Sequence, residues 1–253
     1  DQTKPEISLA IGDNFIYGSH TSWAIMGFFA RVNYAYKNRY LIELNGRFDG
    51  SSRFPTDQQW GFFPSGSLGW VASEENFWEA LNPYWSFLKL RASYGVTGRS
   101  GFSRYISLAK YTGYGQYWSD TYGKFIMGYG PGNNPNADLK WEKQISYNLG
   151  LDFTLFDSRL SGNLDFFIRD GKDIINNYAV PMPPYLHSSI TTNVGTTQSK
   201  GVELSVNWDA VKTKDFSYST NLTLSYMKTM MKSFSNETYS LSYIEGDGFP
   251  SPG

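Results

Sequence analysis

The 253-residue sequence contains no cysteine, only two histidines and no long hydrophobic run. Without cysteine, a disulfide scaffold, a thiolate metal site and a cysteine nucleophile are all excluded. The two histidines, His20 and His187, are too few for a histidine-rich metal site. The longest apolar run, Trp23–Ala30, is far shorter than the ~20 residues of a transmembrane helix. If the chain crosses a membrane, it therefore crosses with strands.

Charge of one sign is also scarce, because the formal net charge is only -1. A nucleic-acid-binding protein would show a basic stripe, so we expect no nucleic-acid partner. No glycine-rich phosphate-binding loop is visible, and both histidines lie in predicted loops. A catalytic triad needs a histidine held by an acid, and the sequence pairs neither histidine with one. We therefore expect no enzyme activity, no metal and no cofactor.

Aromatic residues are abundant by contrast, at 18% of the chain, with 19 Tyr, 18 Phe and 8 Trp. A soluble all-β protein could carry this many. A membrane barrel is expected to, since aromatic girdles mark both of its membrane interfaces.

Period-two alternation of apolar and polar residues is the dominant pattern. In Trp141–Leu155, one face is apolar apart from Lys143, and the other is polar throughout. Globular strands average ~5–6 residues, whereas membrane-spanning strands need ~9–11. The alternating segments reach the longer class and predict eight spanning strands: 24–36, 40–50, 62–73, 86–97, 141–155, 160–169, 200–208 and 216–226.

Ionised side chains lie in the middle of the polar faces of these predicted strands. A water-filled lumen accommodates such residues better than a shared sandwich core does. They would order water, dock a plug or bias solute passage, although simple solvation explains them as well. The predicted lumen-facing residues are Arg31, Glu43, Arg47, Asp49, Lys89, Arg91, Glu142, Asp152, Asp165, Arg169 and Glu203.

The connections alternate between short and long. Short turns at 37–39, 157–158 and 210–215, with a longer one at 74–85, would lie on the periplasmic side. The long connections 51–61, 98–138 and 173–199 would lie outside. This parity requires 98–138 to cross the membrane an even number of times or not at all, with 104–112 and 122–129 as a candidate extra hairpin.

Several stretches, in this order, resemble the SusC/RagA group of TonB-linked outer-membrane proteins. They are the segments 39–54, 63–75, 88–98, 136–142 with its Asp-Leu-Lys-Trp-Glu core, and 201–204. The resemblance implies an antiparallel transmembrane β-barrel of 22 strands with an N-terminal plug inside it. Residues 1–253 would then be a fragment with about 8–10 of those strands, lacking the plug domain, the TonB box and the C-terminal strands.

The resemblance also implies a location and partners. The protein would lie in the outer membrane of a Gram-negative bacterium, in contact with its lipid. It would import oligosaccharides or peptides, with a SusD-like surface lipoprotein as a lid and with TonB acting on the plug.

Aromatic residues in the predicted outer loops are the best candidates for contacting such a substrate. Flat aromatic faces beside polar groups suit sugar rings or peptides, although loop packing or contact with a lid protein explains them equally well. The candidates are Tyr114, Tyr117, Trp118, Tyr122 and Tyr185.

Three alternatives remain open from the sequence. One is a passive porin or another class of outer-membrane receptor, and the second is a soluble β-sandwich carbohydrate-binding module. The third is a barrel enzyme, which would need His20 or His187 beside a nucleophile and an acid.

Overall fold

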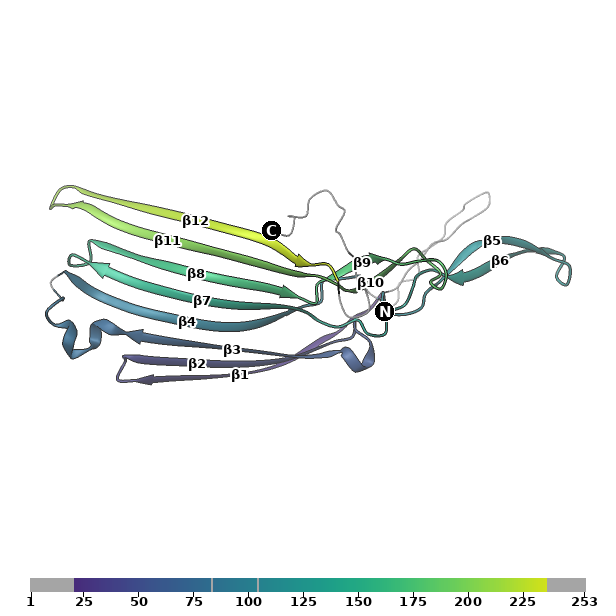
Figure 1. Ribbon diagram of the computed structural model, residues 1–253, viewed down its shortest axis with the longest axis horizontal. Helices are drawn as coiled ribbons and strands as arrows, with labels where there is room; N and C mark the ends of the chain where they lie inside the picture. The colour runs from purple at the N-terminus through teal and green to yellow at the C-terminus, as the bar shows by residue number, and fades with distance from the viewer. Residues whose placement is uncertain (1–20, 83, 104, 236–253) are drawn as a thin grey trace, which may run out of the picture.

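A computed structural model describes residues 21–82, 84–103 and 105–235, and this part of the chain is almost entirely β-structure (Figure 1). Eight strands form one antiparallel sheet in the order β1-β2-β3-β4-β7-β8-β11-β12. The prediction of eight long antiparallel strands is confirmed. Their bounds are β1 Ile25–Tyr36, β2 Tyr40–Ser51, β3 Trp60–Val71, β4 Trp85–Arg99, β7 Glu142–Leu155, β8 Leu160–Lys172, β11 Thr196–Lys212 and β12 Ser217–Ser233.

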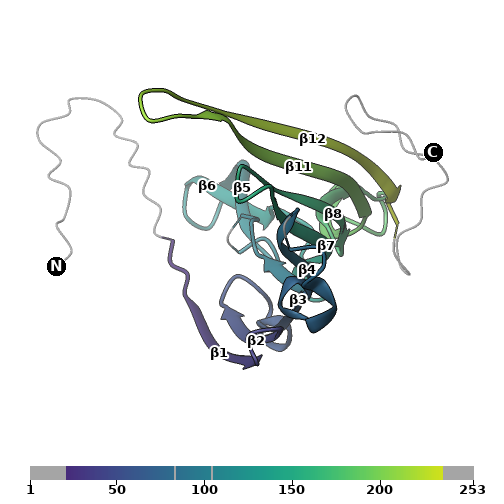
Figure 2. The same cartoon turned by 90° about the vertical axis from the view of Figure 1, so that its left-hand side faces the viewer.

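The sheet curves like a trough when viewed along its strands (Figure 2). β1 and β12 form its two edges, and within the described residues each pairs with only one neighbour. The described residues outside this sheet form two further sheets, each of two strands, so no second sheet large enough to cover the trough is present among them. The β-sandwich alternative requires a second large sheet packed on this one, and the described residues form none.

Strand register places the apolar rows of the strands on one continuous face, although a few apolar residues such as Phe29 and Phe63 lie on the opposite, polar face. One row across the sheet reads Leu90, Leu151, Leu164, Leu204 and Leu224, each opposite the next. Many residues on this face are open to the surroundings, with Phe28 60% and Leu149 57% exposed. An exposed apolar surface of this extent marks a contact with another apolar phase. The described residues include no helix that is long and apolar enough to span a membrane.

The short and long connections lie at opposite ends of the sheet (Figure 1). At the short end, Lys37 and Asn38 both have positive φ values of 51° and 54°, which the tight hairpin between β1 and β2 requires. The connection between β3 and β4, the longest of those at this end, contains two 3₁₀ turns, η2 Ala72–Glu74 and η3 Asn76–Trp78. The predicted alternation of short and long connections is confirmed.

The candidate extra hairpin is present, but one of its strands was predicted in the wrong place. β5 Tyr111–Ser119 and β6 Lys124–Pro131 pair only with each other and extend beyond the end of the eight-stranded sheet (Figure 1). The predicted strand 104–112 fails because its backbone bonds elsewhere. The Asn133 amide donates to the carbonyl oxygens of Ile106 and Leu108, and its oxygen accepts from the Lys110 N–H at 2.9 Å.

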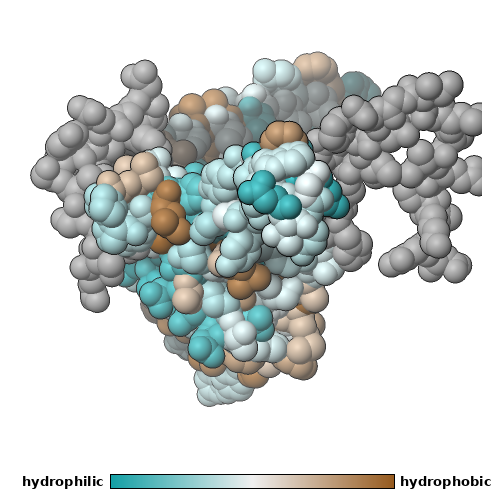
Figure 3. Space-filling view, turned by 90° about the vertical axis from the view of Figure 1, so that its right-hand side faces the viewer, coloured by the Kyte–Doolittle hydropathy of each residue, from teal (hydrophilic) through white to brown (hydrophobic). Residues whose placement is uncertain are grey.

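The buried hydrophobic clusters lie at the end with the long connections. One joins Phe54, Phe63 and Trp141. The other packs Tyr178, Val180, Ile190 and Val194 around the small sheet of β9 Ile175–Ala179 and β10 Ser189–Asn193. η1 Thr56–Gln58 lies in the loop between β2 and β3. These clusters pack the loops against one another, and the surface at this end mixes hydrophilic and hydrophobic residues (Figure 3).

Candidate functional site

The concave polar face of the sheet is the first candidate site. Alternation along each strand, combined with the register between strands, places all the predicted lumen-facing residues on this one face, from Arg31 on β1 to Glu203 on β11. The opposite face carries the apolar rows. A wall with one wet and one apolar face is the pattern of a barrel with a polar interior.

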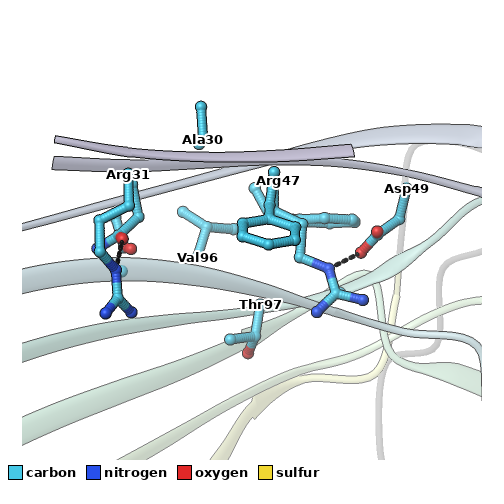
Figure 4. A pocket seen from close by; sticks show the side chains of 13 residues that line it. Ala30, Arg31, Arg47, Asp49, Val96 and Thr97 are labelled. Atoms are coloured by element: carbon cyan, nitrogen blue, oxygen red, sulfur yellow. Dashed lines mark hydrogen bonds and ion pairs between the residues drawn. The ribbon is translucent and has the colours of Figure 1, made fainter. Parts of the chain in front are cut away.

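A groove of about 770 Å³ opens on this polar face near the loop end. Arg31 and Arg47 point into it from β1 and β2, whereas Ala30 points the opposite way (Figure 4). Arg31 Nε donates to Asn45 Oδ1 at 2.7 Å, and Arg47 Nε donates to Asp49 Oδ2 at 2.6 Å. Both arginine side chains stay more than half exposed, so their remaining N–H groups can bind an anionic or carbonyl group.

Charges that the sequence gave no reason to pair are joined in the middle of the wall. Arg91 on β4 donates to both carboxylate oxygens of Asp152 on β7, at 2.9 and 2.8 Å. The same guanidinium reaches Asp165 on β8 at 3.1 Å, and Asn163 donates to Asp165 at 2.8 Å. This cluster ties three neighbouring strands together on the polar face of the sheet. Arg99 and Glu142 form a further pair nearer the loops, at 3.1 Å.

Buried asparagines hold the outer loops in place. Asn134, only 7% exposed, donates to the carbonyl oxygens of His187 and Ser189 at 2.6 and 2.9 Å. Its own oxygen accepts the N–H groups of Leu186 and His187, both at 3.2 Å. Asn193 similarly bridges the carbonyl oxygens of Lys140 and Asp173, each at 2.8 Å.

Sequence reasoning missed these asparagines. For Asn134 the signal was the Asn-Asn-Pro-Asn run at 133–136, but nothing in that run identifies backbone partners some 50 residues away, and Asn193 lies in no such run.

The predicted substrate-contacting aromatics divide between two places. Tyr114, Tyr117 and Trp118 lie on β5 and Tyr122 on its turn, all more than half exposed, so this part of the predicted long connection 98–138 is a protruding strand and turn. Tyr117 pairs with Ile126 and Trp118 with Phe125, and because consecutive residues alternate, the two aromatics face opposite sides of the hairpin.

Tyr185 is not part of the hairpin. It packs against the buried cluster around Tyr178, and its N–H donates to the Pro181 carbonyl at 3.3 Å. The structure therefore does not bring the five aromatics onto one platform.

His187 is the histidine on which an enzyme could be built, because His20 lies outside the described residues. Its Nε2 lies 2.9 Å from the Pro131 carbonyl oxygen and 3.5 Å from the Tyr114 hydroxyl. Within the described part of the chain, no acid holds this ring and no group of three or more potential ligands could bind a metal ion. The contacts of His187 fix the base of the hairpin.

At the opposite end, the sheet carries an anchored carboxylate. Glu75 accepts hydrogen bonds from Tyr40 Oη at 2.7 Å, Trp70 Nε1 at 3.2 Å and Arg39 Nη1 at 3.1 Å. The Tyr40 hydrogen bond, followed by that from Trp70 and by the Arg39 charge, lowers the pKa of Glu75 below its ordinary value of 4.5. Glu75 thus fastens the connection between β3 and β4 to two strands.

Comparison with known proteins gives a consistent result. A family model described as "TonB dependent receptor-like, beta-barrel" matches residues 2–252. The TonB-dependent receptor SusC of Bacteroides thetaiotaomicron is 33% identical over 222 residues, which are 87% of this chain and 22% of SusC. The TonB-dependent receptor P39 of Formosa agariphila is 34% identical over 233 residues, or 92% of this chain and 21% of P39.

Solved structures agree with these relatives. The RagAB peptide importer in its open-open state aligns with a TM-score of 0.78 at 28% identity, covering 89% of this chain and 24% of that chain. The FrpB iron transporter from Neisseria meningitidis, at 17% identity and a TM-score of 0.54, shares the fold alone. The chain spans less than a quarter of the length of SusC, P39 and the RagAB chain.

Proposed function

This chain belongs to the TonB-dependent receptor-like β-barrel family, and we propose that it forms part of the wall of a nutrient importer. Proteins of this family lie in the outer membrane of Gram-negative bacteria, which accounts for the exposed apolar face of the sheet. The observation that carries the proposal is the match to SusC, at 33% identity over 87% of the chain, on a sheet with one apolar and one charged face.

In this proposal, residues 1–253 are one portion of a larger barrel. The unpaired outer edges of β1 and β12 within the described residues would continue into further strands. A plug and a TonB box would belong to other parts of the polypeptide. TonB would act on the plug, and the polar face described above would line the path that plug movement opens.

The imported nutrient would be an oligosaccharide or a peptide. RagAB is described as a peptide importer, and its structure aligns with most of this chain. Arg31 and Arg47 supply free N–H donors in the lumen groove, which suit carboxylate or carbonyl groups. A SusD-like lipoprotein would cover the loop end, where Tyr114, Tyr117, Trp118, Tyr122 and Tyr185 would contact the nutrient or the lid.

Growth of the source bacterium tests the import proposal. Deletion of the full-length gene should abolish growth on either a peptide mixture or an oligosaccharide mixture as the limiting nutrient, and should leave growth on monosaccharides and amino acids intact. Inactivation of TonB should reproduce the same loss, because import is energised. Uptake that persists without TonB would instead indicate a passive porin and overturn the proposal.

A further inference from the structure

The apolar face of the sheet ends in lysines where the long loops begin. Lys143 stands opposite Lys172 on β7 and β8, and Lys200 stands opposite Lys228 on β11 and β12. All of these lysines are exposed, and the register places them on the same face as the leucine row. They lie near the end of the sheet that carries the long loops (Figure 1), and in bacterial barrels the long loops lie on the outer side of the membrane.

Directly opposed lysines on neighbouring strands are unfavourable unless an anion lies between them. Side chains opposite each other in an antiparallel pair have Cβ atoms only ~4.5–5.5 Å apart, so like charges there repel. Among the described residues, no carboxylate forms an ion pair with Lys200 or Lys228. Asp170, an acid on the same face of β8, accepts a hydrogen bond from Gln198 at 2.7 Å.

A shallow apolar groove of about 390 Å³ lies directly beside this lysine pair. Its lining includes Phe166, Val202, Tyr226 and Met230 together with both lysines. Phe166 is 51% and Tyr226 69% exposed, so the groove opens outward to whatever surrounds the wall. The groove therefore has two positively charged lysines at one end and apolar side chains along the rest of its length. This arrangement matches a molecule with an anionic head group and acyl chains.

We propose that Lys200 and Lys228 bind the phosphate of a phosphorylated, acylated lipid of the outer leaflet, whose acyl chain lies in the adjoining groove. Each ammonium would donate to the phosphate, relieving the repulsion between the two lysines. The bound lipid molecule would lie where the lipid-facing surface of the sheet meets the long loops. This inference rests on the placement of the wall in the membrane and is independent of which nutrient is imported.

The test uses the full-length protein in detergent, titrated with lipid A and with the same lipid A after removal of its phosphate, with bound adducts counted by native mass spectrometry. The wild-type protein should retain the phosphorylated form preferentially. Lys200→Gln with Lys228→Gln should weaken its binding about 30-fold, the combined effect of two lysines near an anionic lipid surface. Lys200→Arg with Lys228→Arg should bind like the wild type.

Lys212→Gln is the matched control, because Lys212 lies on the same strand as Lys200 but at the opposite end. It should leave binding unchanged. Equal binding of both lipid forms to the wild-type protein would overturn the proposal, even if the glutamine variant failed to fold. A folded glutamine variant that binds the phosphorylated lipid like the wild type would overturn it as well.

Discussion

Glu75 shows how a single side chain stabilises the end of the sheet that carries the short connections. Its lowered pKa means that folding favours the carboxylate. The stability that it contributes is therefore fully present above the unfolded pKa and is lost as the pH falls through the lower, folded pKa. Without the negative charge, the donors from Tyr40, Trp70 and Arg39 lose an ionised acceptor.

We expect Glu75→Gln to lower the thermal unfolding midpoint of the full-length protein at pH 7. The gap from the wild type should shrink as the pH falls through the folded pKa, because the wild-type carboxyl then becomes neutral too. Glu74→Gln is the control, since Glu74 is exposed and has no ion pair among the described residues. A gap that stays constant at every pH would contradict the role assigned to the Glu75 charge.

Asn134 has the corresponding role in the outer loops. Its side chain satisfies two carbonyl oxygens and two N–H groups of 186–189. Asn134→Ala would leave several of these groups without partners, at a cost of about 1–3 kcal/mol. We expect hydrogen exchange at 186–189 to quicken by about tenfold or more, while the strands of the main sheet keep their protection.

The exposed Asn177 provides the comparison for this experiment. It accepts one hydrogen bond, from the Thr191 hydroxyl at 2.7 Å, on the same small sheet. Asn177→Ala should therefore change exchange at 186–189 little. If both variants behave alike, the buried asparagine does not hold the loops.

The strands were predictable from the sequence because each has one apolar and one polar face, and this difference produces an alternating sequence. Segment 141–155 alternates along almost its whole length, and β7 spans Glu142–Leu155. β11 runs from Thr196 to Lys212, beyond the predicted 200–208, because its first residues, 196–199, are polar on both faces and the pairing with β12 shifts register between Asp209 and Val211, so the alternation fades at both ends. Hydrogen bonding to the neighbouring strands, rather than the alternation of apolar and polar residues, determines where these strands end.

The loops were not predictable in the same way. Asn134 and Asn193 bond to backbone groups far along the chain, and such contacts leave no period in the sequence. The cluster of Arg91, Asp152 and Asp165 needed the register of three strands, which alternation alone does not provide. The sequence therefore predicts which face a side chain lies on, and the pairing determines what that side chain contacts.

Close packing of neighbouring strands gives a test at the level of the element. A Cβ at Gly162 on β8 would overlap the Ser205 carbonyl oxygen and lie 2.8 Å from the Phe153 ring. The backbone of β11 cannot yield without losing its pairing with β8, so Gly162→Ala should destabilise the protein by about 1–3 kcal/mol. The variant should lose its heat-modifiable, folded band on gels at a lower temperature than the wild type.

Gly46 on β2 lies on the same apolar face and provides the matched control. A Cβ there would come no closer than 3.4 Å, to the ring of Phe62. Gly46→Ala should therefore unfold close to the wild-type temperature. Equal behaviour of the two variants would show that β8 and β11 are not packed as closely as described.

At the scale of the whole molecule, the described residues form a sheet with one apolar face and one polar face. Lipid would cover the apolar face, and water or a plug would meet the other. Residues 1–253 contain no cysteine, so a cysteine introduced here for a spin label is the only one in this part of the protein. Leu224 and Ser225 are adjacent and both exposed, yet they face opposite sides of β12, and Val32 and Asn33 do the same on β1.

We expect labels at Leu224→Cys and Val32→Cys, in full-length protein in lipid, to collide more with oxygen than with a water-soluble nickel chelate. Labels at Ser225→Cys and Asn33→Cys should show a lower ratio of oxygen to nickel collisions, because oxygen concentrates in the lipid. Both edges of the sheet are labelled because a continuous wall requires the apolar-face label to have the higher oxygen-to-nickel ratio at β1 and at β12. Equal ratios within either pair would mean that this part of the sheet does not separate lipid from lumen.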